Sequence, residues 1–589
     1  MFRIGSGGQL SLFVRGTHRR RTIAAAINVF VLMAALVAAS TAQASPRPAQ
    51  APVAAAVTPP AITCAQAAQL DLTGVPGAPA NVTSATIIAA AGNTLGRWEA
   101  CSVKGIIAPQ IQFNLLLPTQ TWTGRYLQTG CGGFCGSVSF DAQATYGCLP
   151  LTDGEFAVAA DNEGHVGAGF TDGLFGADPQ LRVDFGYRSQ HLTSLVAKEI
   201  IKRFYGRSAA RSYFTGCSEG GDQAMTEAQR YPGDFDGIVA GAPASNMTAL
   251  AVFDQAWNAK AVLDANGNPT LTVADLASLH TAVVNACDTL DGTQDGLISD
   301  SQSCSFDPKS IACPASGSST SGFCLTPAQV ASVRKVYGGA RDEKNRLLYP
   351  GAQPRGSELD WAGWLIPWSA GGLSNQGGFA VNTVRWLAYP GPRPSLTLND
   401  ITFTEKSFKD IMGRVSGIYD SIDPDLSAFR KRGGKLIMWH GEADPAVPPA
   451  GTIAYYQAVT EQMDGLARTQ EFARLFMLPG VAHCSGGEGP DKLDALTAVV
   501  DWVERGKAPE SLTTTKVTSG AVTATRPAYP WPLMAVNTTG GPADQASSYT
   551  AQPRKSAGQT VSWLGSFRSG YEKTCEWING RWVCRNAKA

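Results

Sequence analysis

The chain has 589 residues, of which 44% are hydrophobic and 16% are charged. This composition is that of a folded globular protein and excludes a largely disordered chain. The 48 basic and 48 acidic residues balance, so no excess of positive charge indicates a nucleic acid partner. Because the length exceeds what a single hydrophobic core usually supports, we expect a large domain with an insertion.

The first 44 residues have the three parts of a secretory signal peptide. An apolar run over 23–39 lies between a basic, acid-free start and the A-x-A site at 42–44. An uncleaved membrane anchor is the alternative, but the run is short for a span, and no other stretch is long enough to cross a bilayer. We expect a cleaved signal over 1–44, a Pro/Ala-rich linker over 45–60 and no stable membrane association after cleavage. The basic residues of the start are Arg3, Arg15, Arg19, Arg20 and Arg21.

The mature chain would carry 43 basic and 48 acidic residues, and it would keep all 13 cysteines of the sequence. In an oxidising compartment most of these cysteines should be paired, and an odd number leaves at least one free. We therefore predict a secreted or periplasmic protein. The sequence indicates neither the export route nor the oligomeric state.

From residue 61 to 244, short apolar segments alternate with helical periodicity. Strands are expected over 124–130, 156–162 and 236–244, and a strand, turn and helix over 211–221. A helix is expected over 187–205, where one face carries Leu192, Leu195, Val196, Ile200 and Phe204. This alternation indicates a largely parallel sheet covered on both faces, which would form the first part of a catalytic domain.

The pattern changes over 245–425, which holds several prolines and glycines, two pairs of cysteines and many tryptophans. A clear strand returns only at 435–441. A stretch of this length between two sheet strands indicates an inserted domain, which we call the lid. The catalytic domain would then resume over 426–589.

The end of the chain, CEWINGRWVC (575–584), predicts a hairpin. Asn579-Gly580 is the preferred pair for a type I′ turn. Folding about this turn places Trp577 opposite Trp582 and Cys575 opposite Cys584, in the closer class of cross-strand pairs. A disulfide between Cys575 and Cys584 fits that geometry.

Residues 214–225, FTGCSEGGDQAM, place Ser218 in a G-x-S-x-G motif between an expected strand and an expected helix. This context is that of a nucleophile elbow, a strained turn that presents the serine oxygen above a sheet and needs small flanking residues. The alternative is a glycine-rich turn with an idle serine. The strand before and the helix after favour the nucleophile.

A serine nucleophile needs a base, and the base needs an acid that orients it. Of the six histidines, only His440 and His483 follow the serine and lie outside the lid. His440 ends a strand whose loop also holds Asp444, and His483 lies in a loop after the apolar segment 472–480. We predict Asp444 as the acid, His483 as the base and a structural role for His440.

Cysteines flank two members of this predicted triad. Cys217 directly precedes Ser218, and Cys484 directly follows His483. A triad would bring the two sulfurs close together, and a disulfide between them would tie the nucleophile to the base. The alternative is that each is a small buried apolar residue, as cysteine often is.

The arrangement Cys217-Ser218, Asp444 and His483-Cys484 resembles the tannase and feruloyl esterase family of α/β-hydrolases, which includes hydrolases of mono(2-hydroxyethyl) terephthalate. The resemblance covers residues 61 to about 535. It rests on WTGRYLQTGCGGF (122–134), FTGCSEGGDQAM (214–225), YPGDFDGIVAGAPA (231–244), CDTLDGTQDGLI (287–298) and HGEADPAVPP (440–449). It implies an α/β-hydrolase fold, with a doubly wound, mostly parallel sheet and a large inserted lid, and it implies the Cys217–Cys484 bond.

An oxyanion hole should use two backbone N–H groups. One is that of Glu219, the residue after the nucleophile. The other should come from loop 130–133, where Gly132 and Gly133 are both candidates. The sequence departs from the family pattern near this loop, since three cysteines are extra and could form one pair and one free thiol. They are Cys131, Cys135 and Cys148.

In the lid, CDTLDGTQDGLI places Asp288, Asp291 and Asp295 within eight residues. Hard oxygen ligands suit Ca²⁺, although the spacing is not that of an EF-hand. The alternative is a solvated acidic turn. The resemblance implies a structural calcium ion bound by these three side chains and by the carbonyls of Thr293 and Leu297.

Further disulfides are expected around this loop and at the start of the catalytic domain. Cys287–Cys304 and Cys313–Cys324 would brace the lid, and the other two cysteines expected to be bonded are Cys64 and Cys101. The family's cysteine after Arg-Pro near the C-terminus is replaced by Ala528, which leaves the path of the final segment open.

Taken with the resemblance, these residues predict a secreted serine carboxylesterase whose partner is a small aromatic ester of the feruloyl, galloyl or terephthaloyl type. The lid tryptophans Trp361, Trp364 and Trp368 could stack on an aromatic acyl group or form the core of the lid. The alternative is a non-catalytic carbohydrate- or cell-wall-binding protein on a hydrolase scaffold, against which the intact triad argues. A peptidase is a weaker alternative that fold analogy alone does not exclude.

Overall fold

A computed structural model describes residues 56–314, 323–369 and 371–567, together with the backbone of 573–578 and 581–586. The described residues all belong to one compact unit, Ala55–Ala589. The predicted signal peptide and most of the predicted linker lie outside them. Within the described part of the chain, no helix has the length and apolar character needed to cross a membrane.

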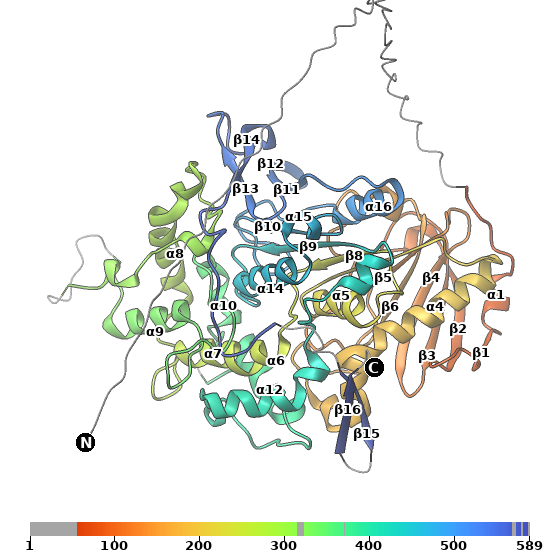
Figure 1. The fold of residues 1–589 in the computed structure, drawn as a ribbon, viewed down its shortest axis with the longest axis horizontal. Coiled ribbons are helices and arrows are strands. Elements are labelled where there is room, and N and C mark those ends of the chain that lie inside the picture. The colour runs from red at the N-terminus through yellow and green to blue at the C-terminus, as the bar shows by residue number, and fades with distance from the viewer. Residues whose placement is uncertain (1–55, 315–322, 370, 568–572, 579–580, 587–589) are drawn as a thin grey trace, which may run out of the picture. The chain divides into compact units, whose positions relative to one another are not determined.

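A ten-stranded sheet organises this unit (Figure 1), with the strand order β1-β2-β3-β4-β6-β5-β7-β8-β9-β10. The six strands from β6 to β10 in this order run parallel to their neighbours, whereas β1 to β4 are antiparallel and β4 meets β6 antiparallel. The bounds are β1 (Asp71–Leu72), β2 (Ala80–Ile88), β3 (Ala100–Ile107), β4 (Ile111–Pro118), β5 (Arg125–Thr129), β6 (Phe156–Asp161), β7 (Arg211–Cys217), β8 (Gly237–Gly241), β9 (Lys435–Gly441) and β10 (Ala473–Leu478).

Helices occupy most of the connections between these strands. Their bounds are α1 (Cys64–Ala67), α2 (Leu149–Thr152), α3 (Pro179–Val183), α4 (Ser189–Tyr205), α5 (Glu219–Arg230), α6 (Met247–Ala249), α7 (Ala256–Ala261), α8 (Val273–Cys287), α9 (Pro327–Gly338), α10 (Trp361–Trp364), α11 (Asn375–Asn382), α12 (Glu405–Tyr419), α13 (Ser427–Lys431), α14 (Pro449–Gln462), α15 (Leu466–Thr469) and α16 (Ala495–Arg505). The long helix α4 ends at Gly206, whose φ of 69° is the left-handed conformation that glycine adopts without strain.

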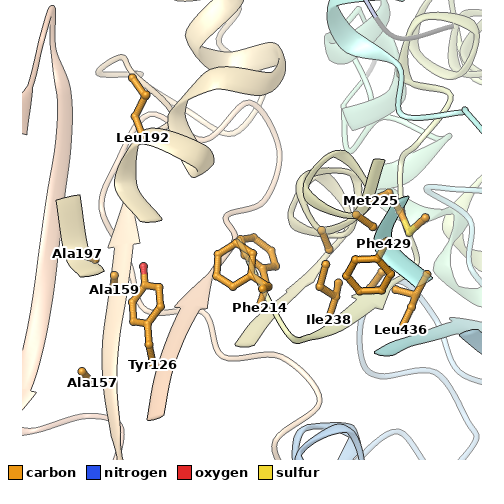
Figure 2. Close-up of a cluster of buried hydrophobic side chains, with 14 of the residues drawn as sticks. Tyr126, Ala157, Ala159, Leu192, Ala197, Phe214, Met225, Ile238, Phe429 and Leu436 are labelled. Atoms are coloured by element: carbon orange, nitrogen blue, oxygen red, sulfur yellow. The ribbon is translucent and has the colours of Figure 1, made fainter. Parts of the chain in front are cut away.

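The parallel strands are buried on both faces, because successive side chains along a strand point to opposite sides. Tyr126, Phe214 and Ile238 belong to one buried cluster with residues of α4, α5 and α14. Figure 2 shows part of this cluster. The residues that follow Tyr126 and Ile238 in the chain, Leu127 and Val239, belong to a second buried cluster with residues of α16. The sheet is therefore covered on both sides, as the near-continuous apolar strands predict.

The expected elements of the catalytic domain agree with those observed. The strands predicted over 124–130, 156–162 and 236–244 contain β5, β6 and β8, and the predicted helix over 187–205 contains α4. The antiparallel strands β1 to β4 are an addition to the parallel sheet that the sequence pattern does not show.

The predicted lid lies between two strands that are neighbours in the sheet. β8 and β9 pair in parallel, so the chain leaves the sheet after β8 and returns to it at β9. Between them lies a buried cluster drawn wholly from residues 261–366, and two disulfides, Cys287–Cys304 and Cys313–Cys324, close loops in this segment. In Figure 1, α8 and α9 of this segment lie at the opposite end of the unit from β1 to β4. The boundaries at 244 and 425 stay a prediction.

Three two-stranded sheets follow the main sheet. Their strands are β11 (Leu512–Thr518), β12 (Ala521–Ala528), β13 (Leu533–Asn537), β14 (Tyr549–Pro553), β15 (Lys573–Ile578) and β16 (Arg581–Asn586), paired antiparallel in that order. The register of the last hairpin places Cys575 opposite Cys584 and Trp577 opposite Trp582, as predicted. The predicted turn Asn579-Gly580 and the side chains that would form the disulfide lie outside the described residues.

Candidate active site

Ser218 lies on a sharp turn between β7 and α5. Its φ and ψ of 66° and −121° are a sparsely populated conformation for a non-glycine residue. A side chain is not tolerated beside it, because a Cβ atom added to Gly216 would lie 2.3 Å from the carbonyl oxygen of Gly220. The turn is fastened to the next strand, since the N–H of Ser218 donates to the carbonyl of Gly241 over 3.0 Å. This is the geometry of a nucleophile elbow.

His483 links Ser218 to Asp444. Its Nε2 lies 2.7 Å from the Ser218 Oγ, and its Nδ1 lies 2.7 Å from an Asp444 carboxylate oxygen. These distances fit a neutral imidazole that donates through Nδ1 to the carboxylate and accepts the serine hydroxyl at Nε2. Ser218 follows β7, Asp444 follows β9 and His483 follows β10, so the three side chains meet at the carboxyl ends of parallel strands.

The Asp444 carboxylate is fully buried and fixed on both oxygens. One oxygen accepts the N–H groups of Ala446 and Val447 over 2.8 and 3.0 Å. Burial acts to raise its pKa, but His483 and His440 outweigh burial and hold the pKa below its usual range. The carboxylate therefore stays ionised beside His483.

His440, predicted to be structural, is buried next to Asp444. Its Nε2 lies 2.9 Å from the carbonyl oxygen of Val447 and 3.2 Å from Asp444, and its Nδ1 lies 2.9 Å from the Thr452 hydroxyl. Because the two atoms near Nε2 are acceptors, this nitrogen carries the proton. His440 thus donates to the same Asp444 carboxylate oxygen that His483 contacts.

Cys217 and Cys484 are joined by a disulfide, with their Cα atoms 5.9 Å apart and 267 residues apart in the chain. The bond connects the neighbours of Ser218 and His483. Nucleophile and base are therefore joined both by a hydrogen bond and by a short covalent path.

Cysteines also close the loop after β5. Cys131 and Cys135 form a disulfide, and Cys148 is the free thiol among the described cysteines. Burial raises the pKa of this thiol to about 12, so it stays protonated at neutral pH. At the start of the catalytic domain, Cys64 and Cys101, both expected to be bonded, form a disulfide with each other.

A pocket opens above Ser218, with about 400 Å³ of space, part of it open to solvent. Gly133 lines it and Gly132 does not. A Cβ atom at Gly133, whose φ is 63°, would lie 2.4 Å from the ring of Phe170. Among the described residues, neither the N–H of Glu219 nor that of Gly133 donates to a backbone carbonyl of a loop or turn, so both are open to an acceptor bound at the serine. This geometry favours Gly133 over Gly132 as the second oxyanion donor.

The walls of this pocket are mostly apolar and come from both parts of the catalytic domain and from the lid. The lining residues are Gly133, Phe134, Phe170, Ser218, Glu219, Ala244, Met247, Leu250, Ala251, Gln255, Trp364, Phe379, Ala446, Val447 and His483. None of these carries a positive charge other than His483 when protonated. Such a wall suits an uncharged aromatic group.

The three lid tryptophans differ in position. Trp364 lines the pocket, and its ring lies edge-on to that of His483 with the centroids 5.3 Å apart. Trp361 is fully buried in the lid core, and Trp368 is 76% exposed. Of the two interpretations open for these side chains, stacking on a substrate fits Trp364 and core packing fits Trp361.

Glu219, the residue after the nucleophile, has a buried side chain. Burial, with the nearby Asp222 carboxyl, raises its pKa well above the usual range. A protonated carboxyl adds no negative charge next to the position where an oxyanion would form.

The acidic loop of the lid has a cationic partner that its local sequence does not show. Asp291 and Asp295 each form an ion pair with the guanidinium of Arg526 on β12, at 2.6 and 2.5 Å. Asp288 instead accepts the backbone N–H groups of Asp295 and Gly296. The three carboxylates of this loop do not form a tight cluster. Among the described residues, the carboxylates whose oxygens lie within 4.8 Å of one another are those of Asp342, Glu343 and Glu405.

The donor chemistry of the loop nonetheless fits a calcium ion. Three carboxylates and one guanidinium leave two negative charges, which the two positive charges of Ca²⁺ would balance. All the predicted ligand atoms are hard oxygens.

A serine at a strand-to-helix elbow, hydrogen-bonded to a histidine that is paired with a buried aspartate, defines an α/β-hydrolase with a Ser-His-Asp arrangement. A model of the family described as "Tannase and feruloyl esterase" matches residues 93–552. The chain therefore belongs to the tannase and feruloyl esterase family, and it is a carboxylic ester hydrolase.

Known proteins agree with this assignment. The chain is 34% identical over 501 residues to a mono(2-hydroxyethyl) terephthalate hydrolase of Piscinibacter sakaiensis, covering 74% of this chain and 82% of that protein. It is 33% identical over 419 residues to a protein of Aspergillus flavus named "Probable feruloyl esterase B-2", covering 67% and 75%. The crystal structure of feruloyl esterase B from Aspergillus oryzae superposes with a TM-score of 0.70 at 28% identity, covering 80% of this chain and 97% of that one.

Proposed function

We propose that the protein is a secreted serine esterase that hydrolyses esters of aromatic acids through an acyl-enzyme. The observation that supports this most is the hydrogen-bonded series from Ser218 through His483 to Asp444 at the base of an apolar pocket. A non-catalytic binding protein would have no need of this series.

In the proposed reaction, the Ser218 Oγ attacks the ester carbonyl carbon while the His483 Nε2 takes its proton. The negative charge that develops on the carbonyl oxygen is stabilised by the N–H groups of Glu219 and Gly133. His483 then gives the proton to the departing alcohol. A water molecule, activated by the same nitrogen, attacks the acyl-enzyme and releases the acid. Asp444 holds the imidazole in the required tautomer throughout.

The pocket wall supports an acyl group that is aromatic and uncharged. Trp364, Phe170 and Phe379 line it, and no lysine or arginine does so among the described residues. A second carboxylate on the acyl ring, as in a terephthalate monoester, would lose hydration there without gaining a cation. We infer that esters of the feruloyl type are preferred to terephthalate monoesters. A galloyl ring, with three hydroxyls, is also disfavoured, because few polar side chains line the pocket.

Two further parts of the proposal concern the setting of the enzyme. Export is supported by the signal-like first 44 residues and by five disulfides in the described chain. A structural Ca²⁺ in the lid is supported by the donor set of the acidic loop. Asp288, Asp291 and Asp295 would hold it with the carbonyls of Thr293 and Leu297, and its charge would offset the excess of carboxylates.

The test is a hydrolysis panel on the purified mature protein, with methyl ferulate, methyl gallate and mono(2-hydroxyethyl) terephthalate as substrates. We expect kcat/KM to be highest for methyl ferulate. Ser218→Ala should lower turnover of each substrate by roughly 10³-fold or more, since triad members act as a unit. Ser245→Ala is the matched control, because this buried hydroxyl has no hydrogen-bond partner among the described residues. Near-normal turnover by Ser218→Ala would refute the assignment of the nucleophile.

A further inference from the structure

The loop that carries Gly133 is closed on itself. The Cys131–Cys135 disulfide joins residues four positions apart, so Gly132, Gly133 and Phe134 are held inside a small covalent ring. These two cysteines are extra to the family pattern found in the sequence. They lie two positions before and two positions after Gly133, which lines the pocket.

This ring restricts a segment that would otherwise be unusually free. Two adjacent glycines populate more backbone conformations than any other pair, so an open Gly132-Gly133 segment would hold one conformation weakly. In the structure Gly133 has φ 63° and Cys135 has φ 55°. A non-glycine residue such as Cys135 rarely adopts a positive φ in an open chain. Closing the ring removes conformations in which the Gly133 N–H points away from Ser218.

The disulfide is also attached to the helix of the nucleophile. Gln223 lies on α5, one turn after Glu219, and its side-chain amide N–H₂ lies 3.4 Å from the Cys131 sulfur and 3.5 Å from the Cys135 sulfur. Its carbonyl oxygen accepts the backbone N–H of Cys131 over 3.1 Å. One buried side chain therefore contacts both ends of the ring.

The packing around the ring completes this attachment. The N–H of Phe134 donates to the carbonyl of Phe170 over 2.9 Å, and the Phe134 ring packs edge-on against Phe379 with the centroids 5.0 Å apart. A Cβ atom added to Gly130 would lie 2.6 Å from Gln223. The loop is thus fixed to α5 on one side and to the pocket wall on the other.

We propose that the Cys131–Cys135 disulfide and Gln223 form a positioning unit, which sets the N–H of Gly133 at a fixed place relative to the N–H of Glu219. The proposal rests on the proposed serine esterase function. Neither sulfur nor the Gln223 amide touches the reacting atoms. Their role is to keep the second oxyanion donor in line with the first through both the acylation and the deacylation step.

The main test replaces both cysteines. Cys131→Ala/Cys135→Ala should lower kcat by about 10- to 100-fold, because displacing a catalytic group by about 1 Å costs on the order of 10²-fold, while KM changes little. An aryl boronic acid, which forms a tetrahedral adduct on the serine, should lose affinity by the same factor as kcat. The inhibition constant of the aromatic acid product, which has no tetrahedral centre, should stay nearly constant. This division separates a lost oxyanion donor from a general loss of structure.

The matched control is Cys313→Ala/Cys324→Ala, which removes another short-range disulfide, with a separation of 11 residues, from the lid. It should leave kcat and boronic acid affinity unchanged. An equal loss in both double variants, or no loss in Cys131→Ala/Cys135→Ala, overturns the proposal.

A second variant decides the matter if the first does not fold. Gln223→Met keeps the disulfide and the side-chain volume but removes the contacts of the amide. It should lower kcat and boronic acid affinity together and raise the hydrogen exchange rate of the Gly132 and Gly133 amides. Unchanged kcat and unchanged exchange in this variant also overturn the proposal. Loss of activity in Ser218→Ala is measured separately, so a failure here leaves the proposed function standing.

Discussion

The triad and the acidic loop of the lid are both groups of polar residues that short sequence motifs predict, yet they are built differently. Ser218, His483 and Asp444 follow parallel strands of the main sheet and hydrogen-bond to one another. The aspartates of the loop depend on Arg526, which lies 231 residues beyond Asp295 in the chain. The first group is complete within its motifs, and the second is completed by a distant segment.

A second arginine of the C-terminal segment repeats this pattern. Arg554 is buried and forms ion pairs with Glu442 and Asp300, and burial lowers its pKa to about 10. Glu442 lies two residues before Asp444, and Asp300 follows the acidic loop. The C-terminal segment therefore connects the lid to the loop of the catalytic acid through buried charges.

The largest effect on stability is expected at Arg526. Arg526→Gln leaves Asp291 and Asp295 buried without their cation, and breaking a buried ion pair costs about 3–5 kcal/mol. We expect a fall of several degrees in Tm, measured by calorimetry. Arg334→Gln is the control, because the partner of Arg334 among the described residues is Asp307 at an exposed position, where an ion pair contributes little.

A bound calcium ion would share with Arg526 the neutralisation of the acidic loop. If the ion binds the loop, EDTA lowers the Tm of the wild type, elemental analysis finds calcium in the untreated protein, and Arg526→Gln becomes more dependent on added Ca²⁺. An EDTA-independent Tm in a protein without bound calcium would show that Arg526 neutralises the loop by itself, and the calcium proposal would fall.

A smaller effect, on rate rather than stability, is expected at the disulfide of the triad. Cys217→Ala/Cys484→Ala removes the covalent path between the neighbours of nucleophile and base. We expect kcat to fall by about 10²-fold under conditions where circular dichroism shows a folded protein, since a displacement of about 1 Å has that cost. A kcat within twofold of the wild type would mean that the hydrogen bonds of His483 suffice.

The sequence predicted those parts of the molecule that depend on neighbours in the chain. The strand before Ser218, the helix after it and the order of serine, acid and base identified the triad, because an α/β sheet brings the ends of parallel strands together. The same reasoning could not separate Trp361, buried in the lid core, from Trp364, beside His483. The burial of each tryptophan depends on how the lid packs. On a regular helix, two residues three positions apart would share a face. Here the backbone between Trp361 and Trp364 is not helical, so the two side chains differ in position.

The partner of the acidic loop escaped prediction for a related reason. In the sequence, Arg526 stands out only as the first residue of the Arg-Pro pair that lacks the family's cysteine. Nothing in its local sequence marks it as buried, and an arginine is rarely buried unless it is paired. Arg554 lies just after β14, in the polar stretch AQPRKS, and nothing in its local sequence marks it as buried either.

A third ion-pair group links the lid to the catalytic loop directly, and it was not predicted. His280 on α8 lies 2.8 Å from Glu358 of the lid and 2.6 Å from Glu488, which follows His483 by five residues. The other charged groups near it are Asp360 and Lys516. Burial opposes the charged imidazole, but the two glutamates outweigh burial and raise its pKa to about 9.

This pKa predicts a contribution to stability that depends on pH. A histidine usually titrates near 6.5, so the charged ring stabilises the folded state fully below that pH, and the contribution is lost as pH rises from about 6.5 to about 9. At its largest it amounts to no more than about 3 kcal/mol. His280→Gln should therefore lower Tm by a few degrees at pH 6 and by little above pH 9.5, measured by calorimetry across this range. Because other titrating groups are common to both proteins, the difference in Tm isolates His280. A constant difference from pH 6 to 9.5 would show that His280 acts by packing or neutral hydrogen bonds, and that no charge links the lid to the loop of His483.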